Sequence, residues 1–279
     1  MSIVLMYITN QPAIARIAEN AGVDWIFVDM EFIGKDSRQG GLDTVQNHHT
    51  VDDVKRIRKT ISKSKLLVRV NPIHDALENY PSSKDEIDAV TESGADILML
   101  PFFKTVEEVK TFIKYVNGRA KTLLLVETIE AANLIDEILE VPGIDMILLG
   151  LNDMHLQMGM KFMFELLANG TVERLGEKIK AKGIPFGFGG IATLAGGALP
   201  GSMVLKEHVR LGSSMVIVSR SFCNTEIVKD YNEVESIFSK GIRDIRDLEA
   251  KIQSKPMDYF EENRKAVVAA VNKIAGTNY

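Results

Sequence analysis

The chain has 279 residues, of which 46% are hydrophobic and 25% charged, and its formal net charge is −5. This composition is typical of a globular protein, and the length suits one large domain or two small ones. The sequence contains no Lys/Arg-rich block, which argues against nucleic acid and anionic membranes as main partners. Apolar runs stay shorter than the roughly 18 residues of a membrane helix. Cys223 is the single cysteine and no signal peptide is expected, so we expect a reducing, cytoplasmic location.

Eight apolar runs of strand length alternate with amphipathic helical patterns. We predict strands over 3–8, 25–29, 66–70, 97–100, 123–126, 146–149, 185–188 and 215–219, and helices over 12–20, 51–62, 84–93, 106–116, 131–139, 172–182 and 204–211. The strands are apolar at nearly every position, as expected when both faces are covered. Eight β/α units predict one (β/α)8 TIM barrel domain over residues 1–279. An open doubly wound sheet is the alternative, and the missing Gly-x-Gly-x-x-Gly after the first strand disfavours it.

Long connections follow several predicted strands. The segments 32–50, 152–171 and 189–203 all leave the carboxyl ends of strands, where they can build or cover an active site. Beyond the last strand the sequence predicts helices over 225–240, 242–252 and 257–275. This is more helix than the barrel needs. We therefore expect the extra C-terminal helices of residues 225–279 to pack on a neighbouring subunit of a homo-oligomer.

Charged residues stand where four of the predicted strands end. They are Glu31, Arg69, Glu127 and Asp153, and parallel strands bring their carboxyl ends to one edge. Glu127 and Asp153 could hold a divalent cation, with water and substrate in the other positions. Arg69 beside that cation would suit a 2-oxo acid, because its guanidinium could bind the keto oxygen as it becomes an enolate. A purely structural layer of ion pairs is the alternative.

Histidines are the candidates for proton transfer. His48 and His49 precede Thr50, a plausible N-cap, and could supply a general base or a metal ligand, although a solvated loop pair is equally compatible with the pattern. His74, close to Arg69, is a second candidate. A packing role is expected for Cys223. Glycines after the seventh strand and the Ser-Arg-Ser segment 219–221 lie where many barrels bind phosphate, but glycines there also simply make room.

These segments resemble the HpcH/HpaI aldolase family, within the wider citrate lyase β and phosphoenolpyruvate-binding barrels. The resemblance runs from about residue 8 to about residue 222, and its most specific parts are 28–31, 67–72, 125–128 and 137–145 leading to 150–154. It implies Glu127 and Asp153 as ligands of Mg²⁺, Mn²⁺ or Co²⁺ and Arg69 as the group that binds pyruvate and its enolate. Gly150 and Asn152 would face the substrate carboxylate through backbone N–H groups, and Glu31 would also lie against the substrate.

The reaction that the resemblance implies is reversible cleavage of a 4-hydroxy-2-oxo acid into pyruvate and an aldehyde through a metal-bound pyruvate enolate. Hexamers or assemblies built from dimers are implied as well. The sequence departs from the family where Phe32 replaces a catalytic histidine and Glu92 stands where an aspartate is common. His48 or His49 could replace the missing group. A CoA-thioester lyase, a phosphoenolpyruvate or phosphonate enzyme, and a non-catalytic barrel that binds an oxo acid are the alternatives.

Overall fold

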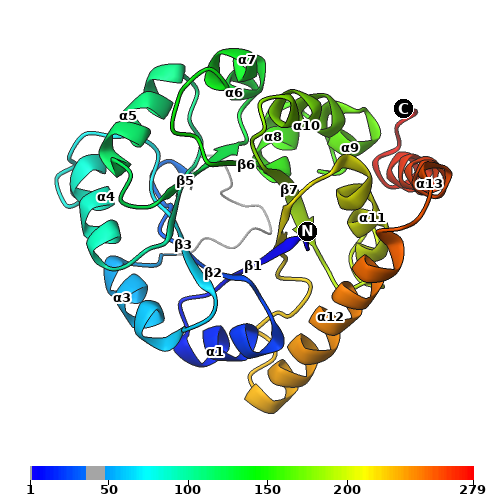
Figure 1. Ribbon diagram of the computed structural model, residues 1–279, viewed down its shortest axis with the longest axis horizontal. Helices are drawn as coiled ribbons and strands as arrows, with labels where there is room; N and C mark the ends of the chain where they lie inside the picture. The colour runs from blue at the N-terminus through cyan, green and yellow to red at the C-terminus, as the bar shows by residue number, and fades with distance from the viewer. Residues whose placement is uncertain (1, 36–47) are drawn as a thin grey trace.

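A closed barrel of eight parallel strands forms the centre of the molecule (Figure 1). The computed structural model describes residues 2–35 and 48–279. The strands follow one another around the barrel in chain order: β1 Val4–Ile8, β2 Trp25–Asp29, β3 Lys65–Arg69, β4 Ile97–Leu100, β5 Lys121–Val126, β6 Met146–Leu149, β7 Phe186–Ile191 and β8 Met215–Val218. The predicted (β/α)8 barrel is therefore confirmed.

Alternate residues of each strand fill the inside of the barrel. Phe27 of β2 and Leu67 of β3 are fully buried there, and the same inner cluster includes Met6, Met99, Leu123, Leu125, Leu148 and Met215. The intervening residues belong to the larger cluster between strands and helices. The barrel is consequently a packed core, and any site has to lie at an end of the strands.

Helices surround the barrel. The longer ones are α1 Pro12–Ala21, α3 Val51–Thr60, α4 Ser83–Glu92, α5 Val106–Val116, α10 Thr171–Ala181 and α11 Gly201–Leu211; shorter ones are α6 Ile129–Asn133, α7 Ile135–Ile138, α8 Leu151–Gln157 and α9 Glu165–Ala168. The single helix predicted over 131–139 is divided into α6 and α7 at Leu134, whose φ of −89° and ψ of 12° leave the helical region. Strand β7 is longer than predicted because its glycines continue it past residue 188, with an irregular register between Gly187 and Gly190.

The chain ends in two long helices, α12 Tyr231–Ile252 and α13 Met257–Ala275. The break predicted near residue 241 is wrong, because Gly241 lies inside α12, where a side chain at this position would come within 2.5 Å of the Phe222 ring. Helix α12 packs on α1 and α11 of its own chain, and α13 packs on α9 and α11 (Figure 1). Packing of this extension on a neighbouring subunit stays a prediction. Within the described ranges, no helix is both long and apolar enough to span a membrane.

Candidate active site

An arginine–aspartate pair lies at the carboxyl end of β2 and β3. Asp29 and Arg69 are partners in the register of these strands and continue the inner rows of Phe27 and Leu67. The Arg69 Nε donates to Asp29 Oδ1 at 2.7 Å, and its Nη2 donates to Asp29 Oδ2 at 2.8 Å. Asp29 is fully buried, whereas 13% of the Arg69 side chain is exposed. This two-fold contact fixes the plane of the guanidinium at the barrel mouth.

Two further charges complete the cluster around Arg69. Its Nη1 lies 3.2 Å from Glu31 Oε2, and Lys35 Nζ lies 3.1 Å from Asp29 Oδ2 and 3.5 Å from Glu31 Oε2. Burial works to lower the pKa of Arg69, but the charges of Asp29 and Glu31 outweigh it and hold that pKa well above its usual value. Three of the five guanidinium N–H groups point at these carboxylates.

Glu127 follows β5 and continues the inner row of Leu123 and Leu125. Its side chain is 3% exposed, and Oε1 accepts a hydrogen bond from the backbone N–H of Phe102 at 3.0 Å. Phe102 has a φ of 46°, a left-handed conformation that costs a non-glycine residue about 1–3 kcal/mol. The strained turn after β4 thus orients the Glu127 carboxylate.

Gly150 makes the space that Glu127 occupies. A Cβ on Gly150 would lie 2.6 Å from Glu127 Cβ and 2.9 Å from Oε2. The Gly150 N–H donates to the Val126 carbonyl at 2.9 Å, so the sheet uses the group that we expected to face a substrate. Asn152, by contrast, lies in the first turn of α8, where backbone N–H groups have no acceptor within the helix.

Asp153 lies on the same first turn of α8 and is 7% exposed. The positive end of the helix dipole favours a carboxylate at this position. Asp153 also lines a cavity of about 590 Å³, together with Phe102, Lys104, Glu130 and Gln157. Phe102 links the two carboxylates, because it lines the Asp153 cavity and its N–H donates to Glu127.

The charge balance and the donor atoms at this end suit a divalent cation. The described residues at this end carry four carboxylates and two cations, which leaves a formal excess of two negative charges. The carboxylates belong to Asp29, Glu31, Glu127 and Asp153, and the cations to Arg69 and Lys35. Glu127 also contributes to the raised pKa of Arg69, which places both groups in one electrostatic field. No cluster of three or more His, Cys, Asp or Glu suited to a metal occurs within residues 2–35 and 48–279. The carboxylate pair fits an ion such as Mg²⁺, which keeps water and substrate oxygens as its other ligands.

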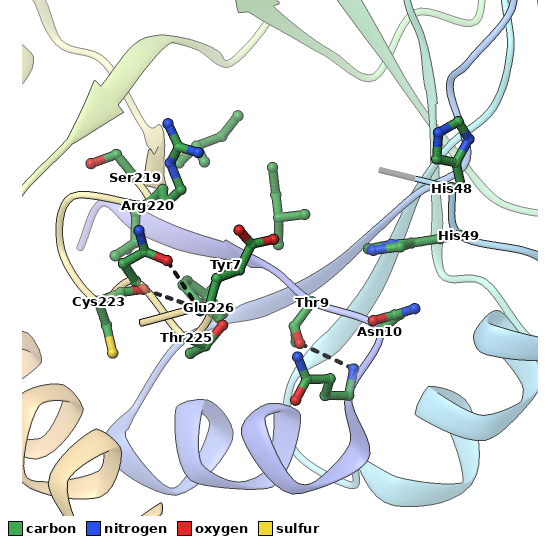
Figure 2. A pocket seen from close by; sticks show the side chains of 15 residues that line it. Tyr7, Thr9, Asn10, His48, His49, Ser219, Arg220, Cys223, Thr225 and Glu226 are labelled. Carbon is green, nitrogen blue, oxygen red and sulfur yellow. Dashed lines mark hydrogen bonds between the residues drawn. The ribbon is translucent and has the colours of Figure 1, made fainter. Parts of the chain in front are cut away.

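The two histidines after β2 differ in their placement. His49 is half-buried, and its Nδ1 accepts a hydrogen bond from the backbone N–H of Asp29 at 3.0 Å. His48 is exposed. Both line a cavity of about 470 Å³ whose other wall includes Ser219 and Arg220 (Figure 2).

Of the other candidates, Cys223 also lines this cavity, whereas His74 and Phe32 do not. His74 contacts the Pro72 carbonyl at 2.7 Å and the Ser83 hydroxyl at 2.9 Å, both in the β3–α4 connection. Phe32 packs edge-to-face on Tyr80, with ring centres 4.8 Å apart. Cys223 is 3% exposed, and burial raises the pKa of its thiol. None of these side chains reaches Arg69 through a described contact.

Comparison with known proteins identifies the family. The sequence model of the HpcH/HpaI aldolase/citrate lyase family matches residues 3–168, more than half of the chain. The chain belongs to this family. It is a lyase family, and the matched range contains the whole cluster of Asp29, Glu31, Arg69, Glu127 and Asp153. A comparison with curated proteins gave no match.

Solved structures of HpcH/HpaI proteins share the fold. The HpcH/HpaI aldolase of Desulfitobacterium hafniense DCB-2 is 17% identical, with a TM-score of 0.59, and the likeness covers 91% of this chain and 94% of that one. A HpcH/HpaI aldolase/citrate lyase family protein of Burkholderia cenocepacia J2315 is 15% identical, with a TM-score of 0.61 and coverage of 84% and 95%. The citrate synthase SbnG is also 15% identical, with a TM-score of 0.61 and coverage of 84% and 94%.

Sequence reasoning missed Asp29, Lys35 and Phe102 as parts of the site. Asp29 could have been found from the two-residue period of β2, because residues 25, 27 and 29 lie on the same face of the strand. The left-handed turn at Phe102 has no sequence signal, because phenylalanine is not a residue that favours it.

Proposed function

We propose that this HpcH/HpaI family member is a divalent-metal-dependent lyase that cleaves or forms a 4-hydroxy-2-oxo acid through a pyruvate enolate. The Arg69 guanidinium supports this proposal most strongly. Asp29 holds it in a fixed plane at the barrel mouth, and the charge of Glu127 acts on its pKa. A structural ion pair does not require a second carboxylate pair beside it. Here Glu127 and Asp153 stand within the same mouth, which favours the catalytic alternative.

Arg69 would bind the keto oxygen of the oxo acid and stabilise the negative charge that develops there. Its raised pKa keeps the guanidinium charged at every physiological pH. Preorganised donors of this kind stabilise a developing enolate more than they stabilise the ground state. Asp29 acts through Arg69 and is therefore a positioning residue.

Glu127 and Asp153 would hold the divalent cation, with Mg²⁺ as the first candidate and Mn²⁺ or Co²⁺ as others. When bound, such an ion supplies Lewis-acid polarisation of the keto group. Gly150 leaves the Glu127 carboxylate the space it needs. The first turn of α8, which carries Asn152, offers backbone N–H groups to a substrate carboxylate.

The aldehyde half would lie toward the cavity lined by His48 and His49, the candidates for contact with the C4 oxygen. The proposal also includes a homo-oligomer in which the helices after residue 225 contact a neighbour, and a cytoplasmic location.

Pyruvate release tests the assignment. Chelator-stripped protein would be incubated with 4-hydroxy-2-oxo acids and Mg²⁺, Mn²⁺ or Co²⁺, and pyruvate would be measured with lactate dehydrogenase and NADH. Glu127→Gln and Asp153→Asn each remove one anionic ligand, so we expect losses on the order of 10²-fold or more. Glu130→Gln is the matched control, because Glu130 lines the Asp153 cavity but is 48% exposed and pairs with Lys104. Unchanged metal-stimulated release in both site variants would refute the proposal.

A further inference from the structure

A hydrogen bond from the barrel fixes the tautomer of His49. The backbone N–H of Asp29 points at His49 Nδ1, at 3.0 Å. An amide N–H can only donate, so Nδ1 must be the nitrogen without a proton. The neutral ring therefore carries its proton on Nε2. Within the described part of the chain, this is the one hydrogen bond of the His49 ring.

We propose that His49 is a neutral hydrogen-bond donor, through Nε2–H, to an oxygen of the aldehyde-derived half of the substrate, and that it is not the general base. This inference rests on the proposed lyase function and assigns the role of one residue within it. The ligand it recognises is an oxygen-bearing aldehyde, or the hydroxyl formed from it at C4.

A base role conflicts with the Asp29 contact. To accept a proton, the ring would have to take it at Nδ1, and the Asp29 N–H would then lose its acceptor. The loss of this buried hydrogen bond would oppose protonation of the ring. Burial already lowers the pKa of His49, and although Asp29 and Asp53 oppose this effect, the net direction is downward. The ring is thus held neutral on both counts.

The chain around His49 is also held in place. Thr50 is the N-cap of α3, and its N–H donates to Asp53 Oδ2 at 2.8 Å while the Asp53 N–H donates to the Thr50 hydroxyl at 3.3 Å. Asn10 Nδ2 donates to the other Asp53 oxygen at 3.2 Å, which ties the start of α3 to the end of β1. His49 therefore directly precedes a capped helix start that is bonded to Asn10. These contacts hold its backbone in place, so its ring can act as a fixed donor.

The cavity beside His49 has the chemistry of an oxygen-rich ligand. Figure 2 shows His48 and His49 on one side, Thr9 and Asn10 near the middle, and Ser219 and Arg220 on the far side. Most of the side chains around this volume of about 470 Å³ are polar, with Ile8, Ile217 and Val218 among the apolar ones. Hydroxyl, amide and guanidinium groups suit an aldehyde that carries several oxygens better than a hydrocarbon one. Ser219 and Arg220, on the β8 wall, lie beyond residue 168, where the family match ends.

The chemistry at C4 balances without a proton from His49. When the enolate carbon attacks the aldehyde carbon, a C–C bond forms, the carbonyl π bond breaks, and its electron pair moves to the oxygen. That oxygen then takes a proton from a solvent water, which becomes hydroxide, and cleavage reverses both steps. The Nε2–H hydrogen bond strengthens as the oxygen becomes negative, which lowers the barrier in both directions. His48 is exposed on the same wall of the cavity.

NMR tests the tautomer without reference to activity. Long-range proton–nitrogen spectra of the ¹⁵N-histidine-labelled full chain distinguish the two neutral tautomers and the imidazolium, and a spectrum of His49→Gln assigns the signals. We expect the Nε2–H tautomer at neutral pH. An Nδ1–H tautomer or an imidazolium would overturn the inference, whether or not the lyase function holds.

Two substitutions separate a donor from a base. Glutamine places an amide N–H near the position of Nε2, whereas asparagine places a carbonyl oxygen near the position of Nδ1. The rate of aldehyde incorporation, divided by the rate of pyruvate hydrogen exchange in the same sample, should fall on the order of 10²-fold in His49→Asn but less than about tenfold in His49→Gln. Equal large losses indicate a base and refute the donor role. Absence of pyruvate exchange in the unsubstituted protein refutes the lyase function instead, while the tautomer measurement still decides this inference.

Discussion

Gly150→Ala is the sharpest perturbation that the structure offers. The backbone tolerates alanine, since Gly150 has a φ of −83° and a ψ of 90°. The new Cβ would, however, lie 2.6 Å from Glu127 Cβ and 2.9 Å from Glu127 Oε2. Ordinary carbon–carbon contacts are about 3.5–4.0 Å, so the Glu127 side chain must move by about 1 Å.

The displacement of Glu127 should slow the reaction and weaken metal binding. A misplacement of about 1 Å costs on the order of 10²-fold in rate, or about 2.7 kcal/mol of barrier. We therefore expect pyruvate hydrogen exchange to fall on the order of 10²-fold and Mn²⁺ affinity, measured by calorimetric titration, to weaken in parallel. Stability should fall by about 1–3 kcal/mol in urea unfolding, as for other overpacked sites.

Gly190→Ala is the matched control. Gly190 also lies at the carboxyl end of a strand, but a Cβ there would meet its nearest neighbours, Ile217 O and Ser219 Cβ, at 3.5 Å. This variant should keep metal affinity and exchange. If Gly150→Ala behaves like Gly190→Ala, Glu127 does not need its present position, and the assignment of Glu127 as a metal ligand is wrong.

Three further changes test the fold and its pH dependence. Gly241→Ala should lower the unfolding free energy by about 1–3 kcal/mol, because the new Cβ would meet the Phe222 ring at 2.5 Å. Urea unfolding midpoints measure this loss. If the Gly241→Ala/Phe222→Leu double variant regains no stability, the explanation is wrong. Burial lowers the pKa of His208 from 6.5 to about 3, so the unfolded chain binds more protons between these values and stability should fall as pH drops through this range, by about 1.4 kcal/mol per pH unit. His208→Asn should flatten that slope in urea titrations at several pH values, and an unchanged slope would show that His208 does not titrate on unfolding. Asp29→Asn should weaken pyruvate binding by about tenfold or more, because it loosens Arg69. Asp52→Asn, which alters an exposed ion pair with Lys55, should leave pyruvate affinity unchanged. Equal pyruvate affinities in the two variants would contradict a positioning role for Asp29.

The barrel could be predicted from the sequence because each strand and helix has its own pattern of apolar residues within a short segment. Apolar runs and intervening helical patterns identify each β/α unit, and only the connectivity rules are needed to close them. The break predicted at Gly241 was wrong for a tertiary reason: the residue is glycine so that Phe222 can approach the helix, and not to end it.

The site was predictable only in part. Arg69 is the last residue of β3, and Glu31, Glu127 and Asp153 come one to four residues after strands, so the carboxyl end of the barrel carries all four, while their roles stay predictions. The pairing of Asp29 with Arg69 depends on strand register, which the apolar pattern does not specify for buried parallel strands. Similarly, the sequence could not distinguish His48 from His49, because the difference arises from the path of the chain into α3 and the one amide that meets His49.

In the proposed function, this chain makes pyruvate enolate at Arg69. Proton–deuterium exchange of the pyruvate methyl group, followed by NMR in deuterium oxide, tests it without knowledge of the aldehyde. We expect chelator-stripped protein to exchange these hydrogens only after addition of Mg²⁺, Mn²⁺ or Co²⁺, and we expect Arg69→Lys to reduce the rate strongly because lysine cannot keep the two-fold contact with Asp29. Folding of the variant would be checked by its unfolding midpoint. Failure of every metal to promote exchange, or equal exchange in the folded Arg69→Lys variant, would contradict the account.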